Sequence, residues 1–578
     1  MPVLQFKGKT AVENHHHTVP HHILEFDEKV SVLGKAEKPG LDGNLIIEGD
    51  NLLALKALLP THAGRIKCVY IDPPYNTGNE SWVYNDNLTQ PQFKDWIGQT
   101  VGKEGEDATR HDKWCCMMYP RLQLLKELLS DDGTIYVSID DNEIQHLRMV
   151  MDEIFGPENW VATIVVQNNP RGRHLSPHIA TSHEYVVCYA RNKETLELKK
   201  AELTQKQVQE YKETDNDGLK YRPLGLRKRG AFSRRQDRPN LHFPIYYNPE
   251  QDIISVEKTS AKEVAIYPKL IDGADGVWRW QKSKVKRDIK LLEARMVTGR
   301  KEWDIFERDY LTVDGVQKGT THKSIWLDKN LNNEVGRETL VAIFGKLVFE
   351  NPKPVALVKE IIRISTGTDD IVLDSFAGSG TTGHAVLELN DEDDGTRRFI
   401  LVQRPHDTKG NEEEKFNVCQ RVTAERARRV ISGYSFTTQR GKKETVEGLG
   451  GSFSYGRVGA PLFGEYRDMG ENLPGYEELA KYIFYTETSR DFDPKDINKE
   501  TGKIGENKTT SYYLLYTPDG AKDRPLDLTW LKLLDKTEKN RHLVVYCEKL
   551  WVHRDDLAKY EVETGRKVRP MLIPFNLK

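Results

Sequence analysis

An acidic residue, two prolines and a tyrosine stand together at Asp72, Pro73, Pro74 and Tyr75. They follow the apolar run 66–71, which is typical of a buried β-strand. Proline fixes φ and has no backbone N–H, so two prolines in a row hold the turn rigid and leave carbonyl oxygens exposed. The turn offers a carboxylate, carbonyl oxygens and a flat ring, a set that can grip a planar molecule carrying an amino group. A rigid surface turn is the alternative interpretation.

A second chemical signal is a glycine-rich turn far along the chain. A strand-like run at 371–374 ends in an acid, the turn 375–380 follows, and a helix is expected from Thr381. Glycines let a ligand approach the backbone, and a helix N-terminus offers free N–H groups. The glycine spacing also fits the dinucleotide fingerprint, which expects an acid about 20 residues later. The next strand, 398–402, ends instead in Gln403, and no P-loop lysine follows the glycines.

The two motifs together resemble those of S-adenosylmethionine-dependent amino-methyltransferases that act on DNA. Their order is similar to that of the β group, and more closely to the modification subunits of type III restriction-modification systems. The segments 44–51, 76–78 and 125–141 also match that family. The resemblance covers roughly residues 40–190 and 335–435.

The resemblance implies an α/β fold. It has a Rossmann-like, mostly parallel methyltransferase sheet, a target-recognition insertion and a small C-terminal α/β domain. Alternating strand and helix patterns support the parallel sheet. Strands are expected at 44–47, 66–71, 134–139, 160–167, 184–190, 371–374, 398–402, 542–547 and 571–574, with 160–167 and 184–190 paired as an edge hairpin. Helices are expected from 51, near 119–129, from 381 and around 554–560. The expected domains are an arm (1–40), the catalytic half (41–167), target recognition (168–334), the cofactor half (335–436), a linker (437–456) and the C-terminal domain (457–578).

Asp72 and Asp374 each end a predicted parallel strand. Ligands of open α/β sheets bind beyond the carboxyl ends of the strands. If the two strands are close neighbours, both acids face one crevice, with the methyl donor on one side and the acceptor on the other. Carboxylates on opposite faces of the sheet would overturn this hypothesis.

The chemistry follows from the weak nucleophilicity of an exocyclic amino nitrogen, whose lone pair is delocalised into the ring. Asp72 can accept one of its hydrogens and the Pro73 carbonyl the other, which aims the lone pair at the sulfonium methyl group. Positioning and electrostatics then do most of the catalysis. Tyr75 would stack on a base flipped out of the duplex. By resemblance, Asp72 favours adenine N6 as the target, and cytosine N4 remains the alternative.

S-adenosylmethionine is the cofactor that the resemblance implies. Its expected binding residues are Asp50, Lys353, Pro354, Asp374, Phe376, Ala377, Gly378, Ser379, Gly380, Thr381 and Gln403. By resemblance, Asp50 bonds the cofactor adenine, although a helix N-cap is an equally open role for it. Asp374 could take the ammonium group. Gln403 stands where the wider family has an acid for the ribose hydroxyls.

Double-stranded DNA is the expected partner. The net charge is −3, so a nucleic-acid surface must come from local clusters. The predicted DNA-binding residues are Arg222, Arg227, Lys228, Arg229, Arg234, Arg235, Arg238, Lys282 and Lys284. They could neutralise phosphates or read guanine edges. For any one of them a solvated charged face is the alternative.

The rest of the sequence sets limits. Among 578 residues there is no apolar run of membrane-spanning length and no C-x-x-C pair, so a cytoplasmic protein with free thiols is expected. No constellation of acids or cysteines accompanies the histidines at 15–17 and 21–22, and no metal site is expected. No Walker A or nuclease motif is found, so the resemblance implies a separate helicase-nuclease subunit, and also a homodimer. Three competing functions are an NAD-dependent oxidoreductase, a non-catalytic DNA-recognition subunit and an RNA or protein methyltransferase.

Overall fold

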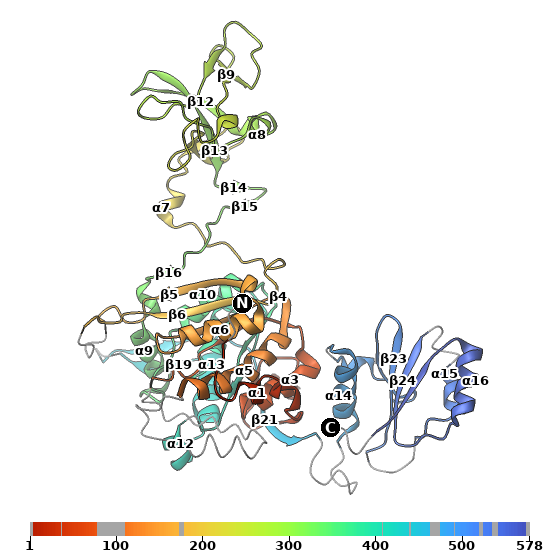
Figure 1. Ribbon diagram of the computed structural model, residues 1–578. Coiled ribbons are helices and arrows are strands. Elements are labelled where there is room, and N and C mark those ends of the chain that lie inside the picture. The colour runs from red at the N-terminus through yellow and green to blue at the C-terminus, as the bar shows by residue number, and fades with distance from the viewer. Residues whose placement is uncertain are drawn as a thin grey trace. The chain divides into compact units, whose positions relative to one another are not determined.

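The structure is a computed structural model that forms two compact units (Figure 1). One unit comprises Met1–Lys199 with Lys323–Lys578, and the other comprises Lys200–His322. The residues described are 4–35, 37–77, 110–172, 178–406, 408–438, 441–462, 474–490, 492–518, 524–534 and 541–573.

A ten-stranded sheet is the centre of the larger unit in the part of the chain described. Its strand order is β1 (His22–Phe26), β21 (Ser454–Pro461), β2 (Leu45–Glu48), β18 (Arg398–Gln403), β17 (Ile371–Asp374), β3 (Ile66–Ile71), β4 (Leu129–Ile139), β6 (Glu184–Ala190), β5 (Trp160–Val166) and β16 (Ile325–Trp326). All neighbours from β21 to β4 are parallel. The predicted mostly parallel sheet is confirmed, as is the antiparallel pairing of β5 with β6.

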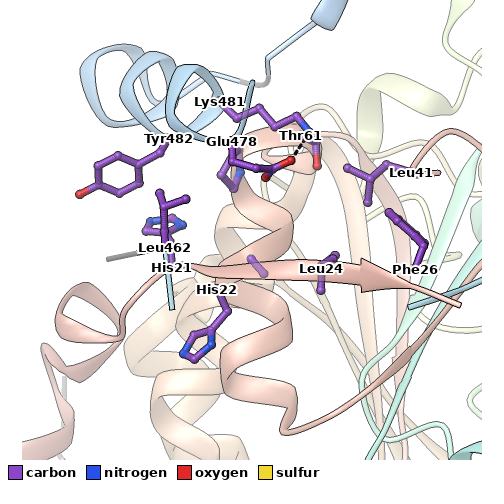
Figure 2. A pocket seen from close by; sticks show the side chains of 12 residues that line it. His21, His22, Leu24, Phe26, Leu41, Thr61, Leu462, Glu478, Lys481 and Tyr482 are labelled. Carbon is purple, nitrogen blue, oxygen red and sulfur yellow. Dashed lines mark hydrogen bonds and ion pairs between the residues drawn. The ribbon is translucent and has the colours of Figure 1, made fainter. Parts of the chain in front are cut away.

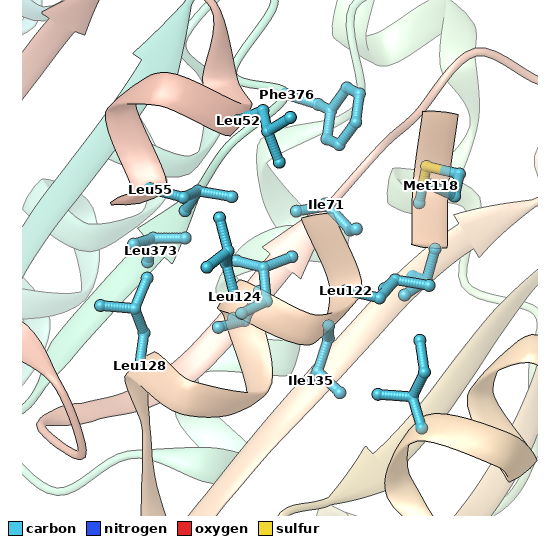
Figure 3. Close-up of a cluster of buried hydrophobic side chains, with 14 of the residues drawn as sticks. Leu52, Leu55, Ile71, Met118, Leu122, Leu124, Leu128, Ile135, Leu373 and Phe376 are labelled. Carbon is cyan, nitrogen blue, oxygen red and sulfur yellow. The ribbon is translucent and has the colours of Figure 1, made fainter. Parts of the chain in front are cut away.

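Helices cover both faces of this sheet. One face carries α3 (Asn51–His62), α5 (Arg110–Leu128) and α6 (Ile144–Phe155), and the other carries α10 (Val355–Ser365), α11 (Thr381–Asp393) and α13 (Glu425–Ser432). Ile71 and Leu373 lie in the first hydrophobic layer with leucines of α3 and α5 (Figure 3). Tyr70 and Val372, one residue earlier on each strand, lie in the second layer. This alternation fixes which face each following residue joins.

The smaller unit is a separate β-rich body. It contains the sheets β12–β13–β8–β7 (Leu292–Val297, Glu302–Tyr310, Lys220–Gly225, Glu213–Thr214) and β10–β9–β11 (Ile253–Ser255, Ile245–Asn248, Val264–Ile266), with α7 (Gln205–Val208), α8 (Lys282–Arg287) and the hairpin β14–β15 (Thr312–Val313, Val316–Gln317). Trp278 is fully buried in its core. The predicted target-recognition range 168–334 is wider than this unit, because β6 and β16 pair with strands of the main sheet.

The predicted boundaries near the two ends differ from the structure. The expected linker 437–456 contains one strand of the hairpin β19–β20 (Tyr434–Thr437, Lys443–Val446) and the start of β21. The expected arm 1–40 contains α1 (Lys9–Val12), α2 (His15–Thr18) and β1, and β1 pairs with β21. Strand pairing, which local composition does not reveal, draws both segments into the main sheet.

The C-terminal part of the larger unit has its own sheet. Its order is β22 (Lys503–Glu506), β23 (Thr510–Leu515), β24 (His542–Cys547) and β25 (Val568–Leu572), and it packs against α14 (Tyr476–Thr488), α15 (Leu528–Leu534) and α16 (Arg554–Thr564). The predicted strand 542–547 and helix from 554 are confirmed. The last strand begins at Val568 rather than at residue 571.

A small cavity lies where α14 meets β1 and α3 (Figure 2). Its volume is about 60 Å³, room for only a few water molecules. His21 and Tyr482 line it, with their rings edge to face. The cavity is too small for a nucleotide-sized ligand. No helix in the described ranges combines the length and the apolar character needed to cross a bilayer.

Candidate active site

The loop Asp72–Tyr75 leaves the carboxyl end of β3 and is fixed on both sides. The Trp114 indole N–H, from α5, donates to the Pro74 carbonyl at 2.7 Å. Asn76 follows in the left-handed region, with φ 57°, and its amide donates to the buried Glu143. No residue that the structure describes donates to the Pro73 carbonyl. The loop is therefore held rigid while that carbonyl stays open to a ligand.

The two acidic turns lie on neighbouring strands. In the parallel pair β17–β3, Val372 lies opposite Cys68 and Leu373 opposite Val69. Continuing this register puts Asp374 beside residue 70, two positions before Asp72. With about 4.8 Å between strands and about 3.3 Å per residue, the two aspartate Cα atoms lie on the order of 8 Å apart. Both residues belong to the same face of the sheet, as the shared crevice requires.

Lys353, just before α10, connects the two turns. Its ammonium group donates to the Tyr75 hydroxyl at 2.6 Å and to Glu184 Oε2 at 2.8 Å, and it lies 3.4 Å from Asp72 Oδ1. Its backbone carbonyl accepts from the Thr381 hydroxyl at 3.2 Å, at the start of α11. One residue therefore contacts both the rigid proline turn and the end of the glycine-rich turn.

Glu184 is a site residue that sequence reasoning missed. It begins β6 and its side chain is 2% exposed. Its Oε2 also accepts from the Tyr75 hydroxyl at 3.1 Å and from the Asn168 amide at 3.0 Å. Its Oε1 is buried and has no hydrogen-bond partner among the described residues. An acid opening an otherwise apolar strand was the only signal in the sequence.

The electrostatics of the crevice are dominated by burial. Burial raises the pKa of Asp72 to about 6, against the opposing effect of Lys353 and with a further increase from Glu184. Burial raises the pKa of Asp374 to about 7, and Asp72 adds to the increase while bonds from Thr382 and Phe376 oppose it. Burial acts to lower the pKa of Lys353, but Asp72 and Glu184 bring it above its ordinary value. Lys353 is thus a cation between two carboxylates.

Asp374 organises the glycine-rich turn. Its Oδ1 accepts from the Phe376 N–H at 3.0 Å and its Oδ2 from the Thr382 hydroxyl at 2.5 Å. Both oxygens are thus already bonded within the protein, a role that the sequence interpretation, which assigned the residue to an ammonium group, did not include. Gly378 and Gly380 have φ of 52° and 78°, conformations that favour glycine.

Gln403 and Thr423 hold Gly378 from two directions. The Gly378 N–H donates to Gln403 Oε1 at 2.7 Å, and its carbonyl accepts from the Thr423 hydroxyl at 2.6 Å. The predicted ribose contact of Gln403 therefore competes with a bond to the loop backbone. A Cβ on Gly378 would lie 3.1 Å from the Phe349 ring, so the loop is closely packed.

Arg426, on α13, donates hydrogen bonds to the glycine-rich turn. The side chain is fully buried, and its guanidinium donates to the hydroxyls of Ser379 and Thr381 at 3.0 and 2.8 Å. Burial lowers its pKa to about 10. The sequence gave no indication of this residue, because it lies on α13 with other arginines.

Asp50 caps α3, as one of its two predicted roles required. Its Oδ1 accepts from the Leu52 N–H at 2.9 Å. The adjacent Asn51 amide donates to the Ser375 carbonyl at 2.9 Å. The Asp50 turn therefore lies next to the glycine-rich turn, and its predicted contact with the cofactor adenine stays a prediction.

The residues present fit a cationic methyl donor. Two carboxylates, those of Asp72 and Glu184, share the Lys353 ammonium group, and the buried Asp374 carboxylate accepts only neutral donors, the Phe376 N–H and the Thr382 hydroxyl. Buried Asp72 Oδ1 and Ser375 Oγ have no hydrogen-bond partner among the described residues. S-adenosylmethionine carries a sulfonium and an ammonium group, so its charge complements this deficit of cations.

A histidine cluster lies behind the proline turn. The Nδ1 atoms of His111 and His146 lie 2.6 and 2.8 Å from separate oxygens of Glu143. The Arg110 guanidinium donates to His111 Nε2, which leaves the His111 proton on Nδ1, facing the carboxylate. Hydrogen bonds from the two imidazole rings therefore hold the Glu143 carboxylate in place, and that carboxylate in turn accepts the bond from the Asn76 amide. Burial raises the pKa of Glu143 to about 7.

The N-terminal histidines have an acid nearby that the sequence did not reveal. His16 Nε2 lies 3.8 Å from Glu127 Oε1, and Glu127 lies in the last turn of α5. Burial lowers the pKa of His16 to about 4, and the neighbouring His17 and Lys56 add to the decrease. An imidazole with so low a pKa is neutral at pH 7 and forms no ion pair with Glu127.

The predicted DNA-binding residues of the smaller unit fall into two groups. Arg222, Arg227, Arg234 and Arg235 form ion pairs with aspartates of the same unit. The Arg227–Asp304 pair is nearly buried, which gives Arg227 a structural role. Lys284 lies over the Trp280 ring. Among residues 200–322 no ion pair involves Lys228, Arg229, Arg238 or Lys282. These four keep their charge available, and their contact with DNA stays a prediction.

Comparison with known proteins gives a family match over more than half of the chain. A family model described as DNA methylase matches residues 66–404. The chain is 33% identical over 374 residues to the type III restriction-modification enzyme EcoPI Mod subunit of Escherichia phage P1, covering 62% of this chain and 57% of that protein. It is 34% identical over 364 residues to the type II methyltransferase M.KpnI of Klebsiella pneumoniae, covering 62% and 80%.

Other similarities extend this picture. The StyLTI Mod subunit of Salmonella typhimurium is 32% identical over 409 residues, covering 67% of this chain and 57% of that protein. The chain thus spans little more than half the length of these two Mod subunits. Among solved structures, the M1.HpyAVI–SAM complex aligns with a TM-score of 0.28 at 13% identity, covering 64% of this chain and 98% of that one. Likeness at that TM-score is too weak to bear on function.

Proposed function

The chain belongs to the DNA methylase family, and from this premise we propose that it transfers a methyl group from S-adenosylmethionine to the N6 amino group of an adenine in DNA. The observation that carries the proposal is the position of Lys353, which contacts Asp72 and Tyr75 with its side chain and Thr381 with its backbone. A dinucleotide oxidoreductase would give the proline turn no role.

In the proposed reaction, bound S-adenosylmethionine supplies an electrophilic methyl group. Asp72 and the Pro73 carbonyl accept the two amino hydrogens of the base and so direct its nitrogen lone pair. As the N–C bond forms and the C–S bond breaks, with its electron pair going to sulfur, Asp72 takes the proton that the nitrogen loses. A pKa near 6 suits this acceptor at neutral pH, because it is ionised yet basic enough to take a proton.

The proposed cofactor contacts follow the two turns. The backbone of 376–380 would hold the methionine part, with Lys353 and Pro354 beside it. Asp50 would bond the adenine. Asp374 and Gln403 would act first by holding the loop in shape, since both are bonded to its backbone. The Tyr75 ring would stack on the base while its hydroxyl keeps its bonds to Lys353 and Glu184.

The test compares the wild type with Asp72→Ala on DNA and labelled S-adenosylmethionine. The variant should lose about 10²–10⁴-fold in methyl transfer and keep cofactor affinity within a few-fold. The matched control is Asp131→Ala, whose side chain is 85% exposed. Mass spectrometry of the product nucleosides identifies N6-methyladenine. N4-methylcytosine would correct the base, and an Asp72→Ala enzyme with full activity would refute the catalytic assignment.

We also propose the partners that the family implies. The unpaired basic residues of the smaller unit would contact the DNA duplex, and a second copy of this chain and a separate restriction subunit would complete a type III assembly. Light scattering of the purified chain, alone and with a DNA duplex, tests for the dimer. A monomer in both cases would contradict that part.

A further inference from the structure

Two buried carboxylates compete for one lysine in the crevice. The Lys353 ammonium lies 2.8 Å from Glu184 but 3.4 Å from Asp72. The first distance is that of a charge-assisted hydrogen bond, and the second exceeds it. Accordingly, Asp72 Oδ1 is buried and forms no hydrogen bond among the described residues. The lysine forms a hydrogen bond with Glu184, whereas its ion pair with the proposed catalytic acid is longer and includes no hydrogen bond.

We propose that Glu184 is a positioning residue that holds the Lys353 ammonium away from Asp72, so that the Asp72 carboxylate stays available to the amino group of the target base. This inference rests on the proposed function and adds a residue to it. Its chemical content is a competition between two acids, in which the non-catalytic one takes the cation.

The surroundings of Glu184 favour its pairing with Lys353 over the pairing of Asp72 with Lys353. Its Oε2 is fixed by the Tyr75 hydroxyl at 3.1 Å and the Asn168 amide at 3.0 Å, so it cannot swing away from the lysine. Its side chain is 2% exposed, whereas that of Asp72 is 25% exposed. Water therefore screens the attraction between Glu184 and Lys353 less than it screens the attraction between Asp72 and Lys353.

Without the Glu184 charge, Asp72 would be the remaining carboxylate partner of the lysine. The ammonium would close to about 2.8 Å from Asp72, the usual length of such a pair. That contact would occupy Asp72 Oδ1, which in the proposed reaction accepts a hydrogen bond from the amino group of the base. It would also make Asp72 a weaker proton acceptor. The other groups that act on Asp72 are the Tyr75 and Tyr70 hydroxyls and Asp374.

The first test is Glu184→Gln, which keeps the side-chain shape and removes the charge. At saturating DNA and S-adenosylmethionine, the single-turnover rate should fall about tenfold or more, while cofactor affinity by calorimetry stays within threefold. The acidic limb of the pH–rate profile should move to lower pH, because Asp72 paired with a cation gives up its proton more easily.

A second substitution separates positioning from simple structural support. In the Glu184→Gln background, Lys353→Met removes the ammonium that would capture Asp72, so the rate should rise above that of Glu184→Gln alone. If Glu184 merely supported the fold, the second change would lower the rate further. Glu197→Gln is the matched control, because it makes the same chemical change at an exposed glutamate outside the crevice; its rate should stay within threefold of wild type.

A crystal structure of Glu184→Gln gives a readout that does not need activity. The Lys353 Nζ–Asp72 Oδ1 distance should shorten from 3.4 Å to about 2.8 Å. An unchanged distance, or a Glu184→Gln enzyme as fast as wild type, overturns the inference. A wild-type protein that methylates no DNA would instead refute the proposed function, and the distance would still decide the role of Glu184.

Discussion

Removing the side-chain acceptor of Gln403 should weaken cofactor binding without disturbing the fold. Gln403 Oε1 accepts from the Gly378 N–H at 2.7 Å, and the residue is 7% exposed. In Gln403→Leu this N–H loses its partner at a place that water reaches poorly. Leaving a buried donor unpaired costs about 1–3 kcal/mol.

That cost would appear in the cofactor affinity if the loop shape described is the one that binds. Each 1.4 kcal/mol is a factor of about ten in a dissociation constant, so Gln403→Leu should weaken S-adenosylmethionine binding by about 5- to 150-fold. Gln403→Glu keeps an oxygen in the same place, and it should bind within a few-fold of wild type. Gln251→Leu, in the smaller unit, is the control for an unrelated glutamine.

Isothermal titration calorimetry measures these affinities, and thermal melting confirms that the variants fold. If Gln403→Leu binds as tightly as wild type, the bond to Gly378 does not shape the cofactor loop. If Gln403→Glu fails as badly as Gln403→Leu, the side chain acts through its amide N–H₂ group, for instance on the ribose, and the argument from the loop backbone is wrong.

Further predictions concern ionisable side chains, some buried and some exposed. Burial lowers the pKa of His62 to about 3, so as pH falls below about 6.5 the unfolded chain takes up a proton that the folded chain does not, and the free energy of unfolding decreases. His62→Gln should remove about 2 kcal/mol of the difference in unfolding free energy between pH 7 and pH 5, as measured by urea denaturation. Arg426→Met should weaken cofactor binding about tenfold while the melting midpoint stays equal or rises, since the guanidinium is buried without a carboxylate bonded to it. Lys228→Ala combined with Arg229→Ala should reduce the salt dependence of DNA binding by a slope of about 2 without altering the melting curve, whereas Arg227→Ala should lower the melting midpoint of the smaller unit, because its partner is nearly buried.

The strands that carry the motifs could be predicted well because their signal is local. The runs 66–71 and 184–190 are strands with the predicted bounds, and 371–374 ends at the predicted acid. Strands covered on both faces of a sheet, as these are, appear as nearly continuous apolar runs, and such runs are visible in a single sequence. The sequence interpretation made the adjacency of β3 and β17 a condition for the shared crevice, and the register meets that condition.

The bonds within the site could not be read from the sequence to the same extent. Lys353 and Glu184 meet only because three segments converge, and no local pattern gives their distance. Asp374 was assigned to a ligand, but its bond to the Phe376 N–H is a local one of the kind that aspartate often makes two residues ahead. This part of its role was within reach of sequence reasoning.

The expected boundaries of the linker differ from the structure for another reason. Residues 437–451 have the Gly-, Lys- and Thr-rich composition of a linker, and β21 contains two glycines and a proline, which are uncommon in strands. Pairing with β2 on one side and β1 on the other supplies the stability that these residues lack by themselves. Such pairing is a property of the whole sheet.

The charge balance of the crevice explains why its parts are held so firmly from outside. Asp72 and Asp374 have raised pKa values, of about 6 and about 7, so their contribution to stability is present at low pH and is lost as pH rises through those values. At neutral pH the ionised carboxylates therefore lower the free energy of unfolding, because a single lysine neutralises them only in part. The bonds from Trp114, Gln403 and Arg426 keep the two turns in place despite this repulsion. A cationic ligand that enters the crevice relieves it, so the same excess of acid that weakens the empty fold favours binding of a sulfonium.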